Sequence, residues 1–155
     1  HAQVNLFLNR AAPWLDIDSY LPYEGRVAIS NKTARRISVR IPPWVTRPRL
    51  ECRLNGDPRR PSWVASYAVF DGLKLNDALE LRFPVAEQTV TRTAYSGKPD
   101  ETAYTIHSRA NTVLDISPRD ESPRSYPFYL RDHMKADIAP KKTVTRYVAP
   151  IIPRW

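Results

Sequence analysis

Apolar and polar residues alternate along most of this chain with a period of two. That period places successive side chains on opposite faces of an extended strand, so the alternation indicates strands with one buried face. The clearest runs cover residues 37–41 and 79–83. The same pattern predicts further strands at 4–8, 14–18, 27–29, 50–54, 63–70, 88–93, 104–107 and 112–117. Short strands at this spacing, with turn residues between them, predict an all-β chain folded as an antiparallel, jelly-roll-like β-sandwich.

Proline and glycine mark the ends of these strands. The 155 residues include 15 prolines and 4 glycines, and the prolines lie between the apolar runs instead of forming one tract. Proline lacks a backbone N–H, so it suits strand ends and edges and argues against long helices. Pro42 and Pro84 each end a strand. Asn55-Gly56 is a hairpin signal because both residues tolerate positive φ, and we expect the returning strand to run from Trp63 to Phe70.

The regular pattern fades near residue 118. We therefore predict a β-sandwich domain over residues 1–130 and an irregular, proline-rich tail over residues 131–155. The tail carries apolar residues between its prolines, so we expect it to pack on the sandwich or on a neighbouring domain. At the other end the chain enters a strand pattern at once, without a leader sequence, which we interpret as a piece cut from a longer protein.

Charge and hydrophobicity limit the classes of partner. The chain has 24 Lys and Arg against 16 Asp and Glu, a net charge of +8, which would suit an anionic partner such as nucleic acid or an acidic polysaccharide. The arginines are scattered, however, and no basic stretch with interleaved aromatic residues is present, so we expect ordinary solvated surface and no nucleic acid. No window approaches the roughly 20 apolar residues of a membrane helix, so we expect no membrane partner.

Few residues show the patterns of catalytic or metal sites. Asp16 and Asp18 share one strand face, a spacing compatible with a glycosidase carboxylate pair, although outward acidic pairs more often serve solubility. Asp115 lies among apolar neighbours, where we expect a structural hydrogen bond, for instance to an arginine. The single cysteine, Cys52, shares its strand face with leucines and is expected in the core. Metal-binding spacings and phosphate-binding glycine loops are absent from the sequence, so we expect no cofactor in this chain.

Aromatic residues near strand ends offer candidate sugar contacts. A sugar site needs aromatic rings with hydrogen-bonding groups around them, and the tryptophans Trp14, Trp44 and Trp63 lie close to predicted strands. Our candidates for sugar or interdomain contacts are Trp44, Trp63, Tyr126, Tyr129 and His133. The alternative for each tryptophan is packing in the core or against a neighbouring domain.

Several strings in the sequence resemble one enzyme family. They are Val4 to Phe7, Leu21 to Val27, Ser38 to Trp44, Leu54 to Gly56 and Leu79 to Val85. The strand end formed by residues 40–44, followed by a strand and Asn-Gly, is the most specific of them. Together they resemble the region after the catalytic barrel in glycoside hydrolase family 127. Asn111 to Pro118 and Tyr129 to His133 are similar to a subgroup of these proteins.

This resemblance implies a place within a larger enzyme. In the family, an (α/α)6 helical barrel precedes β-sandwich domains, and characterised members are β-L-arabinofuranosidases with a zinc-bound cysteine nucleophile and a glutamate acid/base. Those groups belong to the barrel and no residue here matches them, so zinc is expected only in the parent's catalytic domain. We therefore expect a non-catalytic accessory domain whose partner is the helical barrel. The alternative is a free-standing carbohydrate-binding or interaction module.

Overall fold

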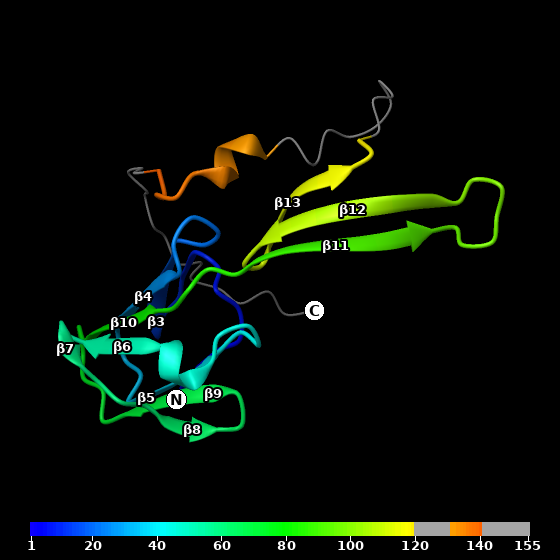
Figure 1. Cartoon of the computed structure of the whole chain (residues 1–155). Helices are drawn as coiled ribbons and strands as arrows, with labels where there is room; N and C mark the ends of the chain where they lie inside the picture. Colours follow the sequence, from blue (N-terminus) through cyan, green and yellow to red (C-terminus); the bar gives the residue numbers. More distant parts are fainter. Residues whose placement is uncertain (120–130, 141–155) are drawn as a thin grey trace, which may run out of the picture. The chain divides into compact units, whose positions relative to one another are not determined.

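The computed structural model of the chain describes residues 1–119 and 131–140 (Figure 1). These residues form two compact units. Unit 1 contains His1–Tyr20 and Gly25–Pro84, and unit 2 contains Leu21–Glu24 with the described part of Val85–Ala139. The predicted boundary between a sandwich at residues 1–130 and a tail at 131–155 falls beside residues outside this description, and it stays a prediction.

Unit 1 is a β-sandwich of two sheets. The four-stranded sheet has the order β1-β5-β9-β8, with β1 at Ala2–Val4, β5 at Arg36–Arg40, β9 at Tyr67–Asp71 and β8 at Ser62–Val64. The six-stranded sheet has the order β2-β3-β4-β10-β6-β7, with β2 at Arg10–Ala11, β3 at Leu15–Ser19, β4 at Arg26–Asn31, β10 at Ala78–Arg82, β6 at Glu51–Leu54 and β7 at Asp57–Pro58. All pairs are antiparallel except β1 with β5, which is parallel. The predicted all-β, largely antiparallel sandwich is confirmed.

The period-two pattern explains the core. In the six-stranded sheet, Ile17 and Leu79 both lie opposite Ile29, and all three are buried. In the four-stranded sheet, Ile37 lies opposite Phe70 on the face that is likewise buried. Removing such a side chain from water contributes roughly 1.5–3 kcal/mol, so these two inner faces hold unit 1 together.

The segment between β1 and β2 corrects the predicted strand at 4–8. β1 ends at Val4, and the following residues cross from the edge of one sheet to the edge of the other. Phe7 turns inward and stacks on Phe83, with ring centroids 5.7 Å apart. Leu6 and Leu8 remain exposed. Residues 5–8 therefore cross between the sheets with one ring turned inward. The alternation of apolar residues alone does not distinguish such a crossing from a strand.

The Asn55-Gly56 signal marks a hairpin, but the returning strand differs from the prediction. Asn55 and Gly56 have φ of 54° and 90° and join β6 directly to β7, where Leu54 pairs with Asp57. The return is only two residues long because Pro58, lacking an N–H, ends the ladder at the sheet edge. The predicted return from Trp63 to Phe70 instead forms β8 and β9, a hairpin of the other sheet.

Unit 2 is built on a three-stranded antiparallel sheet, β11-β12-β13. Its strands are β11 at Glu87–Ala94, β12 at Thr102–Arg109 and β13 at Thr112–Ser117. The predicted final hairpin is confirmed as β12 with β13. A short 3-10 turn, η2 at Asp132–Lys135, follows in the second described stretch. No helix among the described residues is long and apolar enough to cross a membrane.

Candidate binding surfaces

Two of the three carboxylates that the sequence suggested for catalysis, Asp16 and Asp115, are bound by basic side chains. Asp16 Oδ1 accepts a hydrogen bond from Lys32 Nζ at 2.7 Å. Asp115 Oδ1 accepts from Arg119 Nε at 2.9 Å, so the predicted arginine partner is present, but the bond is exposed and not buried as expected. Among residues 1–119 and 131–140, no three His, Cys, Asp or Glu side chains gather as a metal site would require. These carboxylates therefore take part in surface ion pairs.

Glu80 forms the most developed ion pair network on the six-stranded sheet. Arg82 Nε donates to Glu80 Oε1 and Arg26 Nε donates to Glu80 Oε2, each at 2.7 Å. The hydrogen bond from Arg82, followed by that from Arg26 and the charges of both, holds the pKa of Glu80 below its usual value of 4.5. Glu80 is thus an ionised structural acceptor.

Cys52 is a core residue, as predicted. Its side chain is buried on the inner face of β6, opposite Leu81. Burial raises the pKa of the thiol to about 11, because a thiolate would lose its hydration there. At neutral pH the thiol is therefore protonated and lacks the thiolate charge that a nucleophile or a metal ligand needs.

The predicted sugar contacts do not come together in the described residues. Trp44 is half-buried in the turn after β5, and its indole N–H is buried without a hydrogen bond partner among those residues. Trp63 in β8 is also half-buried, and the guanidinium of Arg47 lies over its ring, 4.4 Å from the centroid. His133 is exposed on η2 of the other unit. Tyr126 and Tyr129 lie outside the described residues.

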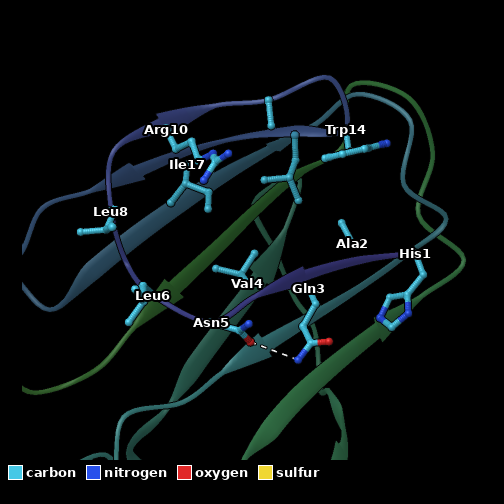
Figure 2. A pocket seen from close by; sticks show the side chains of 12 residues that line it. His1, Ala2, Gln3, Val4, Asn5, Leu6, Leu8, Arg10, Trp14 and Ile17 are labelled. Atoms are coloured by element: carbon cyan, nitrogen blue, oxygen red, sulfur yellow. Dashed lines mark hydrogen bonds between the residues drawn. The ribbon is translucent and has the colours of Figure 1, made fainter. Parts of the chain in front are cut away.

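The N-terminal hollow is a depression of about 420 Å³ in unit 1 that opens between β1 and the β2–β3 pair (Figure 2). Buried Val4, Leu15 and Ile17 line it, and so do three exposed apolar residues. These are Leu6 at 66%, Leu8 at 57% and Trp14 at 54% exposure. The remaining lining residues are His1, Ala2, Gln3, Asn5, Arg10 and Ala12, so no carboxylate is among them.

The geometry of this hollow follows from the ends of both sheets. β1 is the last strand of one sheet and β2 the last strand of the other, and the crossing between them carries Leu6 and Leu8. Polar side chains at its rim are hydrogen-bonded to one another. Gln3 Nε2 donates to Asn5 Oδ1 at 3.1 Å, and the Tyr67 hydroxyl donates to the same oxygen at 2.9 Å. This surface could not be predicted from the sequence pattern, because the alternation that contains Leu6 and Leu8 is typical of a strand.

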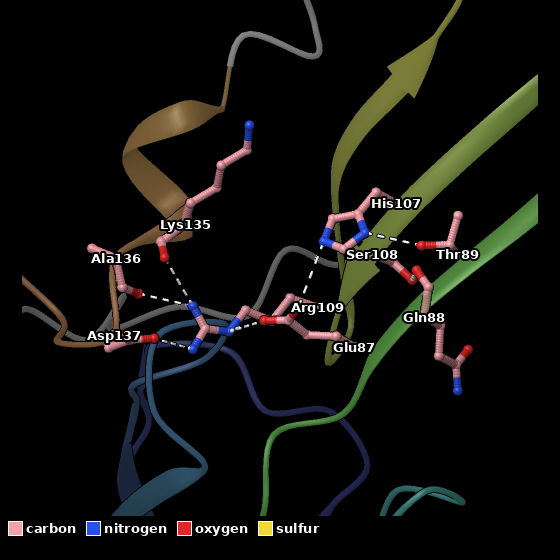
Figure 3. Close-up of polar contacts among 9 residues, drawn as sticks. All are labelled: Glu87, Gln88, Thr89, His107, Ser108, Arg109, Lys135, Ala136 and Asp137. Carbon is pink, nitrogen blue, oxygen red and sulfur yellow. Dashed lines mark hydrogen bonds and ion pairs between the residues drawn. The ribbon is translucent and has the colours of Figure 1, made fainter.

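In the described part of unit 2, the buried Arg109 has several hydrogen bond acceptors (Figure 3). Arg109 on β12 donates to the carbonyl oxygens of Lys135 and Ala136 at 3.0 and 3.1 Å, and to Asp137 Oδ1 at 2.6 Å. Its Nε lies 3.4 Å from Glu87 Oε1, an ion pair within the same unit. This arginine fastens the segment around η2 to the sheet, and its acceptors leave little capacity for a ligand.

Fold and surfaces together define an all-β module with an apolar depression at one edge of its sandwich. No protein-family model matches the chain, and no curated protein matches it. The chain is similar in fold to solved structures that include two glycoside hydrolases, one of them of family 127.

Two solved structures illustrate this likeness. A protein described as a glycoside hydrolase aligns at a TM-score of 0.45 and 19% identity, over 64% of this chain and 17% of its own. A GH127 β-L-arabinofuranosidase from Geobacillus stearothermophilus T6 aligns at 0.46 and 18%, over 64% of this chain and 16% of its own. The chain thus spans about one sixth of the structures it matches, and a likeness at this level carries no conclusion about activity.

Proposed function

We propose that this chain is a non-catalytic β-sandwich that packs against the helical catalytic domain of a glycoside hydrolase resembling family 127. The observation that carries the proposal is the N-terminal hollow with its exposed Leu6, Leu8 and Trp14. Contiguous apolar surface with a polar rim marks an interaction site, because leaving it in water is unfavourable. The resemblance of several strings to the region after the family's barrel supports a helical barrel as the partner. The pairing of Asp16 and Asp115 with basic residues supports a role outside catalysis.

The coding sequence upstream of His1 tests the partner. We expect it to encode, in the same reading frame, a helical barrel with the family's cysteine and glutamate motifs. A start codon immediately before this position, or an unrelated domain, would contradict the proposal.

Self-association of the isolated chain tests the apolar surface. Uncovered, the hollow should drive concentration-dependent association in sedimentation velocity experiments. We expect Leu6→Ser/Leu8→Ser to weaken that association by about tenfold or more, because buried apolar surface contributes roughly 25 cal/mol per Å².

A matched control separates this surface from general stickiness. Leu75→Ser/Val64→Ser removes two residues with 69% and 65% exposure elsewhere in unit 1 and should leave association unchanged. Equal effects of the two double variants would contradict the assignment. Turnover of 4-nitrophenyl β-L-arabinofuranoside by the purified chain would contradict the non-catalytic role.

A further inference from the structure

A second depression, the basic hollow, lies at the opposite edge of the six-stranded sheet from β2. It has a volume of about 430 Å³. It is lined by Leu50, Glu51, Cys52, Arg53, Pro58, Arg59, Arg60 and Pro61. Three arginines and one glutamate therefore share a depression formed by β6, β7 and the segment that leaves β7 for the other sheet.

Two of these arginines are anchored by backbone carbonyl groups, as Arg47 is by the carbonyl of Ala65 elsewhere in unit 1. Arg53 donates one N–H to the carbonyl of Gly56 at 3.2 Å, and Arg59 donates one to the carbonyl of Asp71 at 3.1 Å. Among the described residues, neither of them nor Arg60 forms an ion pair. By contrast Arg26, Arg36 and Arg82 are each paired with a carboxylate.

A carbonyl anchor orients a guanidinium without neutralising it. The group keeps its charge and most of its N–H donors, and less conformational freedom is lost when a ligand binds. Planar guanidinium groups bind carboxylates through two parallel hydrogen bonds. The basic hollow therefore has the charge and the donors of a carboxylate site.

Glu51 narrows the class of ligand. An ionised glutamate only accepts hydrogen bonds, so it favours a ligand that also carries hydroxyl donors and disfavours a phosphate. No aromatic ring lines the hollow, so nucleobases would have no stacking partner. Protein interfaces depend on large aromatic anchors, so the absence of aromatic rings from the hollow also disfavours a protein partner.

We propose that the basic hollow binds a uronic acid unit of an acidic polysaccharide. Arg53, Arg59 and Arg60 bind the carboxylate, and Glu51 accepts from sugar hydroxyl groups. Leu50, Pro58 and Pro61 supply apolar contact for the ring. This inference does not rest on the accessory role, because it concerns a different edge of the sandwich.

Calorimetric titration of the whole chain with trigalacturonate tests the proposal. We expect saturable binding in low salt, weakened by about tenfold or more in Arg53→Ala/Arg60→Ala, because charge-assisted hydrogen bonds to the carboxylate are lost. Arg40→Ala/Arg92→Ala makes the same change in net charge at exposed positions outside both hollows and should bind as the parent does. Circular dichroism checks that both variants fold.

Titrations with other ligands distinguish the uronic acid from a neutral sugar and from other polyanions. Galactotriose, which lacks the carboxylate, should not bind. Absence of trigalacturonate binding, equal losses in the two double variants, or binding of galactotriose would overturn the proposal. Dextran sulfate or an oligodeoxynucleotide binding to Arg53 and Arg60 as tightly as trigalacturonate would overturn it too, since the surface would then select charge alone.

Discussion

Ion pairs fix the position of the Glu80 side chain on the six-stranded sheet. Glu80 accepts from two arginines on its own and the neighbouring strand, and its pKa is lowered accordingly. A carboxyl whose pKa is lower in the folded chain stabilises the fold above its ordinary pKa, and this contribution disappears as the pH falls through the folded-state value.

Glu80→Gln should therefore lower the free energy of unfolding by roughly 1 kcal/mol at pH 7, since the pair is partly exposed. The difference from the parent should shrink below pH 4.5, where the carboxyl of the parent becomes protonated. Urea unfolding at pH 7 and pH 3 measures both values. Asp57→Asn, at an exposed position without an ion pair in the described part of the chain, is the matched control and should change neither. A difference independent of pH would contradict this account.

Gly25 shows how closely backbones approach in unit 1. A Cβ at this position would lie 1.7 Å from the carbonyl oxygen of Phe83 and 2.8 Å from its carbonyl carbon. Gly25→Ala should therefore lower the free energy of unfolding by about 3 kcal/mol or more, because backbone has to move. Gly56→Ala meets open space and only the strain of φ at 90°, about 1 kcal/mol. Thermal unfolding measures the stability of both variants. A larger loss of stability in Gly56→Ala than in Gly25→Ala would contradict this account.

Residue roles that depend on nearest neighbours in sequence were predictable, and those set by distant contacts were not. The alternation around Cys52 placed it in the core, and the apolar run around Asp115 indicated a paired carboxylate. Trp63 was a candidate sugar contact because it follows a proline near a strand. That role stays a prediction. The guanidinium of Arg47, from the crossing after β5, lies over the ring of Trp63, and the sequence pattern does not predict that contact.

At the scale of elements, Arg109 connects the second described stretch to a strand. Replacing it by methionine keeps the apolar stem but removes the donors to Lys135, Ala136 and Asp137. We expect Arg109→Met to speed amide exchange across residues 131–139 by about tenfold or more, because charge-assisted bonds are lost. Hydrogen exchange with mass spectrometry measures this. Arg92→Met on exposed β11 is the control, and unchanged exchange in Arg109→Met would contradict the role.

Strand positions were predicted well wherever one face is buried. β4, β5, β10 and β13 lie where the alternation placed them, because inward residues must be apolar. The prediction failed for β1 and β7, at the edges of the sheets. At an edge the ladder can stop at any residue, so the end of pairing depends on the crossing that follows and not on the alternation itself. The N-terminal hollow was missed for the same reason.

The whole molecule distributes its core unevenly. Of the buried apolar side chains among residues 1–119 and 131–140, all except Pro22 and Leu114 belong to unit 1. β11 has no buried residue along its length. We expect β11 and β12 to open with a free energy at least about 2 kcal/mol below that of β4 and β10, because fewer apolar contacts oppose opening. Native-state hydrogen exchange in rising urea measures both, and a single shared opening would contradict two separate units.

The parallel pairing of β1 with β5 bears on the lifetime of the folded state. Its partners, Ala2 and Ile37, are separated by three further strands, whereas hairpins such as β3–β4 close over short loops. Closing a long loop costs more entropy, so β1 should add after the rate-limiting step of folding. Val4→Ala would then leave the folding rate nearly unchanged and raise the unfolding rate, as stopped-flow kinetics would show. The first few residues would govern how long unit 1 stays folded and hardly how fast it forms.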